Sequence, residues 1–321
     1  MSLALLFSPQ GSQSVGMGRD LALGWPSAAA CFASADAELG WSVSAACWDG
    51  PDEALNDTRQ TQPCLLTASL AGLRALEEAF LRRGERLAPA LVAGHSVGEY
   101  AALVDAGVLP LGDALHLVAL RGTLMADAGV PGGMAAVIGL EREAVASVVA
   151  DAGLGDQLVV ANDNAPGQVV ISGSTAALAR ISASLTWAGA RRIIPLKVSG
   201  PFHSPMMAPV GERLASAFGE ATWHDADPPM VSNVTAEPVR DAARIRSLLA
   251  RQVSSPVEWA RSVRRMVAEG VDTFIECGPG GTLTGMVRRI APGARTLNVS
   301  DAVSLETTVE ALLGAPVGAP A

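Results

Sequence analysis

Hydrophobic residues at the start of the chain form first a short run and then a helical stripe. The run at residues 3–7 ends before Pro9, and a short apolar run closed by proline predicts a buried strand. Leucines then recur at helical spacing after Gln62 and Pro63, and proline favours the first turn of a helix. We therefore expect a long helix that opens at Gln62, and a second strand at residues 91–93.

Two helices are predicted directly after the second strand. Apolar spacing becomes helical from Val97 to Gly107, and glycine is a common helix stop. The next apolar stripe follows Pro110 and continues to about Ala128. Strands that alternate with helices in this way favour a largely parallel sheet of the α/β class.

A smaller unit with a different order of elements is predicted within residues 130–197. The pattern predicts helices and strands in the order 134–138 (strand), 141–152 (helix), 158–161 (strand), 169–172 (strand), 175–188 (helix) and 192–196 (strand). This β-α-β-β-α-β order is typical of a ferredoxin-like arrangement.

Longer segments return after the small unit. They are a helix from Pro205, a strand at 230–232, helices near Ala243 and Glu258, and a strand at 273–276. We therefore expect the small unit, 130–197, to be inserted into a large α/β domain formed by residues 1–129 and 198–313. Residues 314–321, rich in Gly, Ala and Pro, predict a flexible tail.

Composition and charge narrow the class of function. The 321 residues are 49% hydrophobic and so can bury a large core. The net charge of −9, from 23 basic and 32 acidic residues, argues against nucleic acid or a membrane surface as a partner. Because the start lacks a signal-peptide pattern and no stretch is long enough to span a bilayer, we expect a cytoplasmic protein.

The cysteines and histidines predict no metal site and no disulfide framework. Four cysteines and four histidines are scattered without the paired spacing of metal ligands. We expect reduced, mostly buried thiols.

Residues 94–98 read Gly-His-Ser-Val-Gly and stand between a predicted strand and a predicted helix. This pattern is typical of a nucleophile elbow, whose glycines permit the tight turn that exposes a serine hydroxyl. Ser96 is therefore the candidate nucleophile, and the Val97 N–H at the helix start is a candidate oxyanion donor. The alternative is an ordinary strand-to-helix turn in which Ser96 only caps the helix.

A serine nucleophile needs a base, and His203 is the best placed of the four histidines. Its loop ends at Ser204, a predicted N-cap, and Pro205, a predicted first helical residue. Such a loop is expected at the carboxyl end of a strand, where open α/β sheets bind ligands. The alternative for His203 is capping or packing alone. His95, beside the nucleophile, is expected to pack or to orient.

Arg121 places a guanidinium on an otherwise apolar helix face. The stripe around it consists of Ala114, Leu117, Val118, Leu124 and Met125. A buried charge needs an anionic partner. That partner is either a fixed protein carboxylate or the free carboxylate of a dicarboxylic acyl substrate, held in a bidentate pair.

Together with residues 10–13 (Gln-Gly-Ser-Gln) after the first strand, these motifs form a pattern that covers nearly the whole chain. The chain resembles the malonyl-CoA:acyl carrier protein transacylases of bacterial fatty-acid synthesis and the related acyltransferase domains of polyketide synthases. The matching segments are 10–13, 60–63, 94–100, 121–122, 164–168, 200–204, 232–235 and 278–280.

The resemblance implies a large hydrolase-like α/β domain that bears a ferredoxin-like subdomain, with the active site between them. It implies that Ser96 is acylated, that His203 is the base, and that Arg121 pairs with the malonyl carboxylate. Malonyl-CoA is the implied substrate, and the phosphopantetheine form of an acyl carrier protein is the implied partner, without a cofactor or metal.

The resemblance implies further roles for Gln10, Gln252 and Phe202, and it supports the role of Val97. The backbone N–H groups of Gln10 and Val97 form the oxyanion hole, and Gln252 helps to orient the histidine. Phe202 is typical of malonyl-selective members, in which it crowds an α-methyl branch.

One segment departs from the family pattern. Residues 7–11 read Phe-Ser-Pro-Gln-Gly where the family usually has Phe-Pro-Gly-Gln-Gly. Pro9 fixes its own φ and restricts Ser8, so this departure affects the direction in which the Gln10 N–H points.

Two other functions stay open on the sequence. An α/β serine hydrolase, either an esterase or a thioesterase, shares the elbow, although Arg121 argues against it. The second is a specialised or non-catalytic subunit, such as the malonyl-loading component of a malonate decarboxylase.

Overall fold

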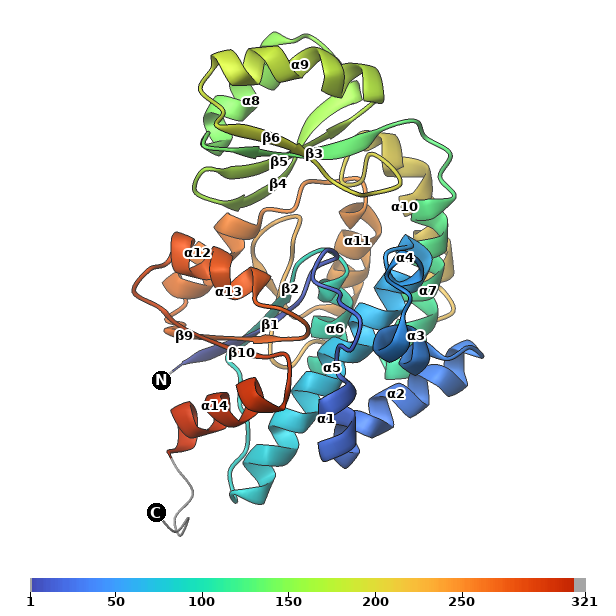
Figure 1. Ribbon diagram of the computed structural model, residues 1–321, viewed down its shortest axis with the longest axis vertical. Helices are drawn as coiled ribbons and strands as arrows, with labels where there is room; N and C mark the ends of the chain where they lie inside the picture. The colour runs from blue at the N-terminus through green and yellow to red at the C-terminus, as the bar shows by residue number, and fades with distance from the viewer. Residues whose placement is uncertain (1, 315–321) are drawn as a thin grey trace.

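The computed structural model describes residues 2–314 and arranges them around two sheets (Figure 1). The larger sheet has the strand order β10-β9-β1-β2-β7-β8, and the smaller one the order β4-β5-β3-β6. The strands are β1 (Leu3–Phe7), β2 (Leu91–Gly94), β3 (Gly133–Ile138), β4 (Leu158–Ala165), β5 (Gln168–Gly173), β6 (Arg192–Pro195), β7 (Met230–Val231), β8 (Pro238–Val239), β9 (Thr273–Cys277) and β10 (Arg295–Val299).

Helices cover both faces of the larger sheet and one face of the smaller one (Figure 1). Their bounds are α1 (Arg19–Gly24), α2 (Pro26–Leu39), α3 (Val43–Asp49), α4 (Asp52–Leu55), α5 (Thr58–Arg82), α6 (Gly98–Asp105), α7 (Leu111–Ala126), α8 (Arg142–Asp151), α9 (Thr175–Trp187), α10 (Ala208–Ala217), α11 (Ala242–Gln252), α12 (Trp259–Ala268), α13 (Thr282–Ile290) and α14 (Ala302–Leu313), with 3-10 turns η1 (Gly155–Gln157) and η2 (Pro205–Met207).

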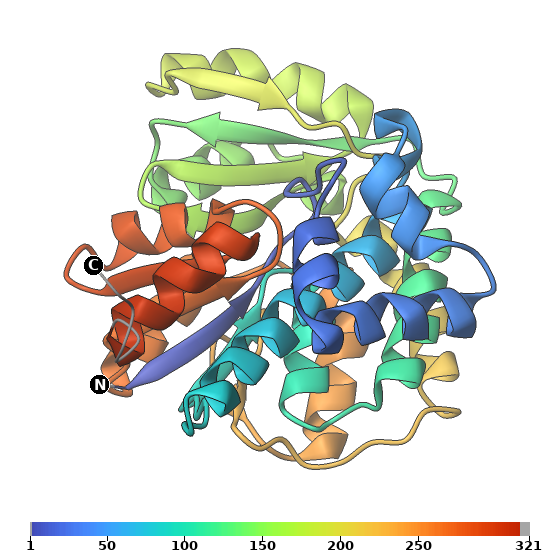
Figure 2. The ribbon, with the colours of Figure 1, turned by 60° about the horizontal axis from the view of Figure 1, so that its bottom comes forward.

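Strand β1 lies in the middle of the larger sheet and is buried on both faces. It pairs in parallel with β2 on one side and with β9 on the other, so strands from the two halves of the chain lie side by side (Figure 2). Leu5 and Phe7 pack into the core cluster that includes α2, α5, α6 and α7. Leu6 points to the opposite face, among side chains of α12 and α13. This two-sided burial explains why β1 is apolar without alternation.

The smaller sheet is antiparallel and carries α8 and α9 on its outer face (Figure 1). Val145 of α8 and Ile181 of α9 pack against Val137 and Val169 of the sheet. Strand β4 is joined to the segment before α12, because Val257 N–H donates to the Ala161 carbonyl at 2.8 Å. The sheet is thereby fixed above the carboxyl ends of the larger sheet's strands.

The predicted α/β class is confirmed, but two predicted helix starts are wrong. Helix α5 begins at Thr58, capped by the Asp57 side chain, and Pro63 lies inside it instead of at its start. The segment from Pro205 opens as a 3-10 turn, and the Ser204 hydroxyl donates to the Pro201 carbonyl at 2.6 Å instead of capping the helix.

The remaining fold predictions stand as follows. Helices α1 to α4 were not expected from the pattern. The proposed division of the chain at residues 130 and 197 stays a prediction, and the predicted tail beyond Gly314 lies outside the described residues. Within residues 2–314, no helix combines the length and apolarity needed to cross a membrane.

Candidate active site

Ser96 occupies a sharp turn between β2 and α6. Its φ is 53°, a left-handed value that a serine adopts only when its surroundings hold it there. The flanking glycines are required by space, because a Cβ on Gly98 would lie 2.2 Å from the Phe7 carbonyl oxygen. A Cβ on Gly94 would lie 1.9 Å from the Gly98 carbonyl carbon. The turn therefore has the geometry of the predicted nucleophile elbow.

Two buried amide side chains hold the Ser96 peptide groups. The Ser96 N–H donates to Asn233 Oδ1 at 2.7 Å. The Ser96 carbonyl accepts from Gln252 Nε2 at 3.0 Å. Asn233 also donates through Nδ2 to the Gly94 carbonyl at 2.6 Å, so it bridges the strand and the turn.

His203 meets the Ser96 side chain. Its Nε2 lies 2.8 Å from Ser96 Oγ, and its φ of 57° is left-handed as well. Its Nδ1 faces the carbonyl oxygens of Gln252 at 3.0 Å and Ser255 at 3.2 Å. Since both of these are acceptors, Nδ1 carries the proton, which leaves the Nε2 lone pair for the Ser96 hydroxyl.

The histidine is neutral in this setting. Burial lowers the pKa of His203 to about 3, helped by the positive charge of Arg121 and by His95. Backbone carbonyls of Gln252 and Ser255 occupy the position that an aspartate takes in a triad.

Arg121 reaches the same serine from α7. Its side chain is buried, with 1% exposure, and Nη2 donates to Ser96 Oγ and to Gln252 Oε1, each at 3.0 Å. Its Nη1 donates to Gln62 Oε1 at 2.6 Å. These hydrogen-bond partners are all neutral. The fixed ion pair with a protein carboxylate, one of the two alternatives for Arg121, is not found among residues 2–314.

A cavity of about 270 Å³ opens onto Ser96 and His203 between the two sheets. Gln10 and Phe202 line it, together with Asn162 and Asn164 of β4. Neither the Gln10 N–H nor the Val97 N–H donates a hydrogen bond within residues 2–314. Of these two residues, Gln10 lines the cavity.

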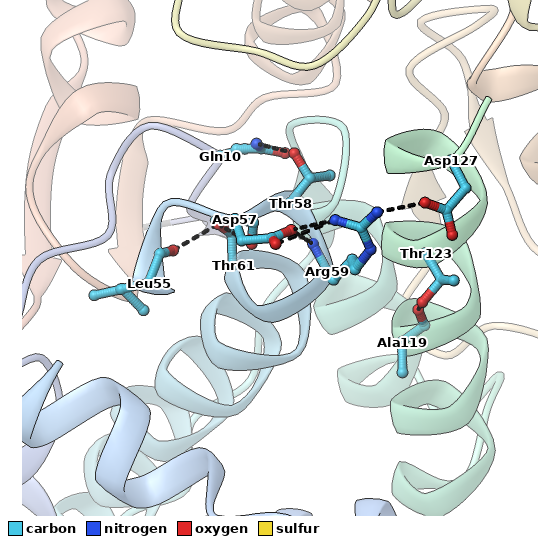
Figure 3. A network of polar contacts seen from close by, with 9 residues as sticks. All are labelled: Gln10, Leu55, Asp57, Thr58, Arg59, Thr61, Ala119, Thr123 and Asp127. Carbon is cyan, nitrogen blue, oxygen red and sulfur yellow. Dashed lines mark hydrogen bonds and ion pairs between the residues drawn. The ribbon is translucent and has the colours of Figure 1, made fainter. Parts of the chain in front are cut away.

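The loop that carries Gln10 is anchored on both sides. Ser8 is buried, and its Oγ lies 3.3 Å from the Pro279 carbonyl and 3.4 Å from Glu276 Oε1. Gln10 Nε2 donates to Thr58 Oγ1 at 3.2 Å (Figure 3). The serine of the Ser-Pro departure thus anchors the loop through its hydroxyl.

Figure 3 also shows an exposed network beside this loop. Arg59, at the start of α5, pairs with Asp57 at 3.1 Å and with Asp127 at the end of α7. Arg59 thereby joins the start of α5, which carries Gln62, to the end of α7, which carries Arg121.

His95 does not reach the Ser96 hydroxyl. Its Nε2 lies 2.9 Å from Asn164 Oδ1, and its ring packs against Trp259 with 5.5 Å between centroids. Burial lowers the pKa of His95 to about 4. The structure thus places His95 in the packing position expected from the sequence.

The sequence reasoning gave no site role to Gln62, which accepts from Arg121, and it missed two residues beside the elbow. Asn233 and Glu99 lie in the recognised motifs at 232–235 and 94–100, but neither received a role. Both are buried polar residues next to the elbow, and this burial is not visible in a motif. All four cysteines are buried and free, as predicted.

Comparison with known proteins gives a consistent family. The model of the acyl transferase domain matches residues 4–308. The malonyl CoA-acyl carrier protein transacylase of Salmonella typhimurium is 43% identical over 310 residues, covering 95% of this chain and 98% of that protein. The enzyme of the same name from Bacillus subtilis is 41% identical over 314 residues, with 97% of each chain covered.

Solved structures agree with these relatives. An acyl carrier protein S-malonyltransferase from Vibrio cholerae superposes with a TM-score of 0.90 at 42% identity, covering 96% of this chain and all of that one. A malonyl-transacylase in complex with its type II polyketide synthase acyl-carrier protein superposes with a TM-score of 0.91 at 39% identity, covering 97% of this chain and 100% of that one.

Proposed function

This chain belongs to the acyl transferase domain family. We propose that it transfers a malonyl group from malonyl-CoA to the phosphopantetheine thiol of an acyl carrier protein, and that Ser96, His203 and Arg121 carry out this transfer. The observation that carries the proposal is the position of Ser96 Oγ, within 2.8 Å of His203 Nε2 and 3.0 Å of Arg121 Nη2 beside a cavity. The reaction supplies malonyl units for fatty-acid or polyketide synthesis.

The first half of the cycle acylates Ser96. His203 Nε2 accepts the hydroxyl proton while Ser96 Oγ forms a bond to the thioester carbonyl carbon. The Gln10 and Val97 N–H groups stabilise the negative charge on the carbonyl oxygen. As the tetrahedral intermediate collapses, the carbon–sulfur bond breaks, and the His203 proton goes to the sulfur of coenzyme A.

The second half reverses these steps with another thiol. His203 removes the proton from the phosphopantetheine thiol, whose sulfur attacks the Ser96 ester. The carbon–oxygen bond then breaks, and the proton returns to Ser96 Oγ. Because the ester waits for its acceptor, the site has to keep water from attacking it.

Two residues explain the choice of acyl group. Arg121 pairs with the free carboxylate of the malonyl group. This buried cation, whose partners Gln62 and Gln252 are neutral, thereby gains an anionic partner. Phe202, which is 3% exposed and lines the cavity, crowds an α-methyl branch. Gln252 orients His203 through its backbone carbonyl at 3.0 Å.

The proposal includes a cytoplasmic location. Four free, buried cysteines suit a reducing compartment. The hydrolase and decarboxylase alternatives lose support, because the relatives cover nearly the whole chain and carry transacylase names.

Intact-mass spectrometry after brief mixing with malonyl-CoA tests the proposal directly. The parent chain is expected to gain one malonyl group, and Ser96→Ala none, while Ser216→Ala on the exposed side of α10 serves as the matched serine control. Addition of the carrier protein should remove the group from the enzyme and attach it to the carrier. Release of free malonate without any thiol acceptor would instead identify a hydrolase.

A further inference from the structure

A buried carboxylate lies directly behind the nucleophile. Glu99 sits one helical turn beyond Ser96 on α6, and its side chain is 2% exposed. One oxygen accepts from the Asn233 N–H at 3.0 Å, and the other accepts from Gln252 Nε2. Both hydrogen-bond partners are neutral amides, so the desolvated charge is not balanced by a direct ion pair. Burial accordingly raises the pKa of Glu99 to about 7.

The two partners of Glu99 are the residues that hold the catalytic groups. Asn233 fixes the Ser96 N–H, and Gln252 fixes the Ser96 carbonyl. Gln252 also accepts from Arg121 through Oε1, and its backbone carbonyl faces His203 Nδ1. The Glu99 carboxylate is therefore hydrogen-bonded to both residues that hold the Ser96 peptide groups, Asn233 and Gln252.

Glu99 also determines which way the Gln252 amide points. Both carboxylate oxygens of Glu99 accept hydrogen bonds, so the NH₂ end of Gln252 faces Glu99. That orientation aims Nε2 at the Ser96 carbonyl and Oε1 at Arg121. If the Gln252 amide were flipped, its oxygen would face two acceptors, the Glu99 carboxylate and the Ser96 carbonyl, and its NH₂ group would face the Arg121 guanidinium. All of these side-chain hydrogen bonds would then be lost.

We propose that Glu99 is a positioning residue for acyl transfer, whose two carboxylate oxygens hold the Ser96 peptide and the Arg121 guanidinium in place through Asn233 and Gln252. The inference rests on the proposed function and adds a residue to it. A purely structural role fits poorly, because a buried carboxylate without a charged partner is expensive to keep.

Glu99→Gln and Glu99→Asp separate positioning from packing. In Glu99→Gln one accepting oxygen becomes a donor, which must face either Asn233 N–H or Gln252 Nε2, while shape and volume are preserved. We expect kcat for malonyl transfer to fall about 100-fold, as for a misplaced reacting group. Glu99→Asp keeps both accepting oxygens but removes a buried methylene group, so it should be the less stable variant and yet the more active one.

Asp105→Asn is the matched control on the same helix. Burial raises the pKa of Asp105 to about 7 as well, but its charged neighbours are Glu77 and Arg74, away from the site. This variant should keep the parental kcat. The measurements are steady-state malonyl transfer and thermal unfolding of all four proteins.

The ranking of the variants decides the outcome. Higher kcat for Glu99→Asp than for Glu99→Gln, against their order of stability, supports the proposal. Activities that follow thermal stability, or a Glu99→Gln enzyme with parental kcat, overturn it. If the parent enzyme itself forms no malonyl-Ser96 ester, the proposed function fails and not the role of Glu99 alone.

Discussion

Arg121 Nη2 lies 3.0 Å from Ser96 Oγ, the same oxygen that lies 2.8 Å from His203 Nε2. The cation thus faces the oxygen that gives up its proton during attack, and it also disfavours a second positive charge on the imidazole. A buried arginine whose hydrogen-bond partners are all neutral gains most from an anionic ligand.

Arg121→Ala should therefore remove the preference for malonyl over acetyl groups. Loss of hydrogen bonds to a charged group, at about 1.5–3 kcal/mol each, predicts at least a ~10-fold fall in kcat/KM for malonyl-CoA. Acetyl-CoA should be affected much less. Acylation rates with the two donors measure the ratio.

Arg59→Ala is the control for this variant. Its ion pairs with Asp57 and Asp127 are exposed, and such pairs contribute about 0–1 kcal/mol to stability. The malonyl-to-acetyl ratio should stay parental. If Arg121→Ala slowed acylation by malonyl-CoA and by acetyl-CoA equally, the proposed pairing of Arg121 with the malonyl carboxylate would be contradicted.

The pH dependence of acylation should reflect the buried histidine. The active form of His203 is neutral, and burial lowers its pKa to about 3 from the ordinary 6.5. Lowering the pH through 6.5 should therefore leave His203 neutral and active, and the loss of kcat/KM for malonyl-CoA due to the imidazole should begin only below about pH 5. A fall in kcat/KM near pH 7 would come from Glu99, whose pKa burial raises to about 7. Stopped-flow acylation, with circular dichroism at each pH to verify folding, tests this. A midpoint at pH 6.5 that persists in Glu99→Gln would mean that the imidazole is hydrated.

Asn233→Ala should weaken the elbow itself. The change leaves the Ser96 N–H without an acceptor and the Gly94 carbonyl without a donor. An unsatisfied buried group costs about 1–3 kcal/mol in the free energy of unfolding. Urea denaturation measures the loss, and Asn298→Ala, which removes a half-buried amide bonded to Gly280, is the comparison. Equal losses in the two variants would argue against a special role for Asn233.

Two glycine substitutions should have opposite effects. In Gly98→Ala the new methyl group meets the Phe7 carbonyl at 2.2 Å, and relief requires β1 to move, so we expect a loss of about 3 kcal/mol or more. Gly285, exposed on α13, has no atom within 4 Å of a new Cβ. Gly285→Ala should stabilise the protein by about 0.5–1 kcal/mol, because alanine favours helix. Thermal unfolding compares both with the parent, and a stable Gly98→Ala protein would contradict the packing argument.

The sequence predicted the strands and helices whose pattern is strong. The unbroken apolar run of β1 and the stripe of α7 lie as expected, including the buried Arg121. Helix α2 was missed because its many alanines and serines give little contrast between faces. Pro63 misled the assignment of α5, because proline suits a first turn, yet tertiary packing holds it inside this helix.

The candidate site was predictable where a residue's chemistry is unusual in its setting. A serine between glycines, a histidine in a loop and an arginine in an apolar stripe each stand out in the sequence. The contacts of Asn233 and Glu99 do not, because they join residues more than a hundred positions apart. No periodicity reports such a bond.

The central place of β1 has a consequence during synthesis of the chain. Leu5 aligns with Val92 on one side, but its partner on the other side, Ile275, is translated 270 residues later. At about 5–20 residues per second, the second edge of β1 stays open for roughly 14–54 s. An apolar strand with an open edge invites pairing with other chains. The nascent protein is therefore expected to depend on a chaperone at the ribosome until its last strands emerge.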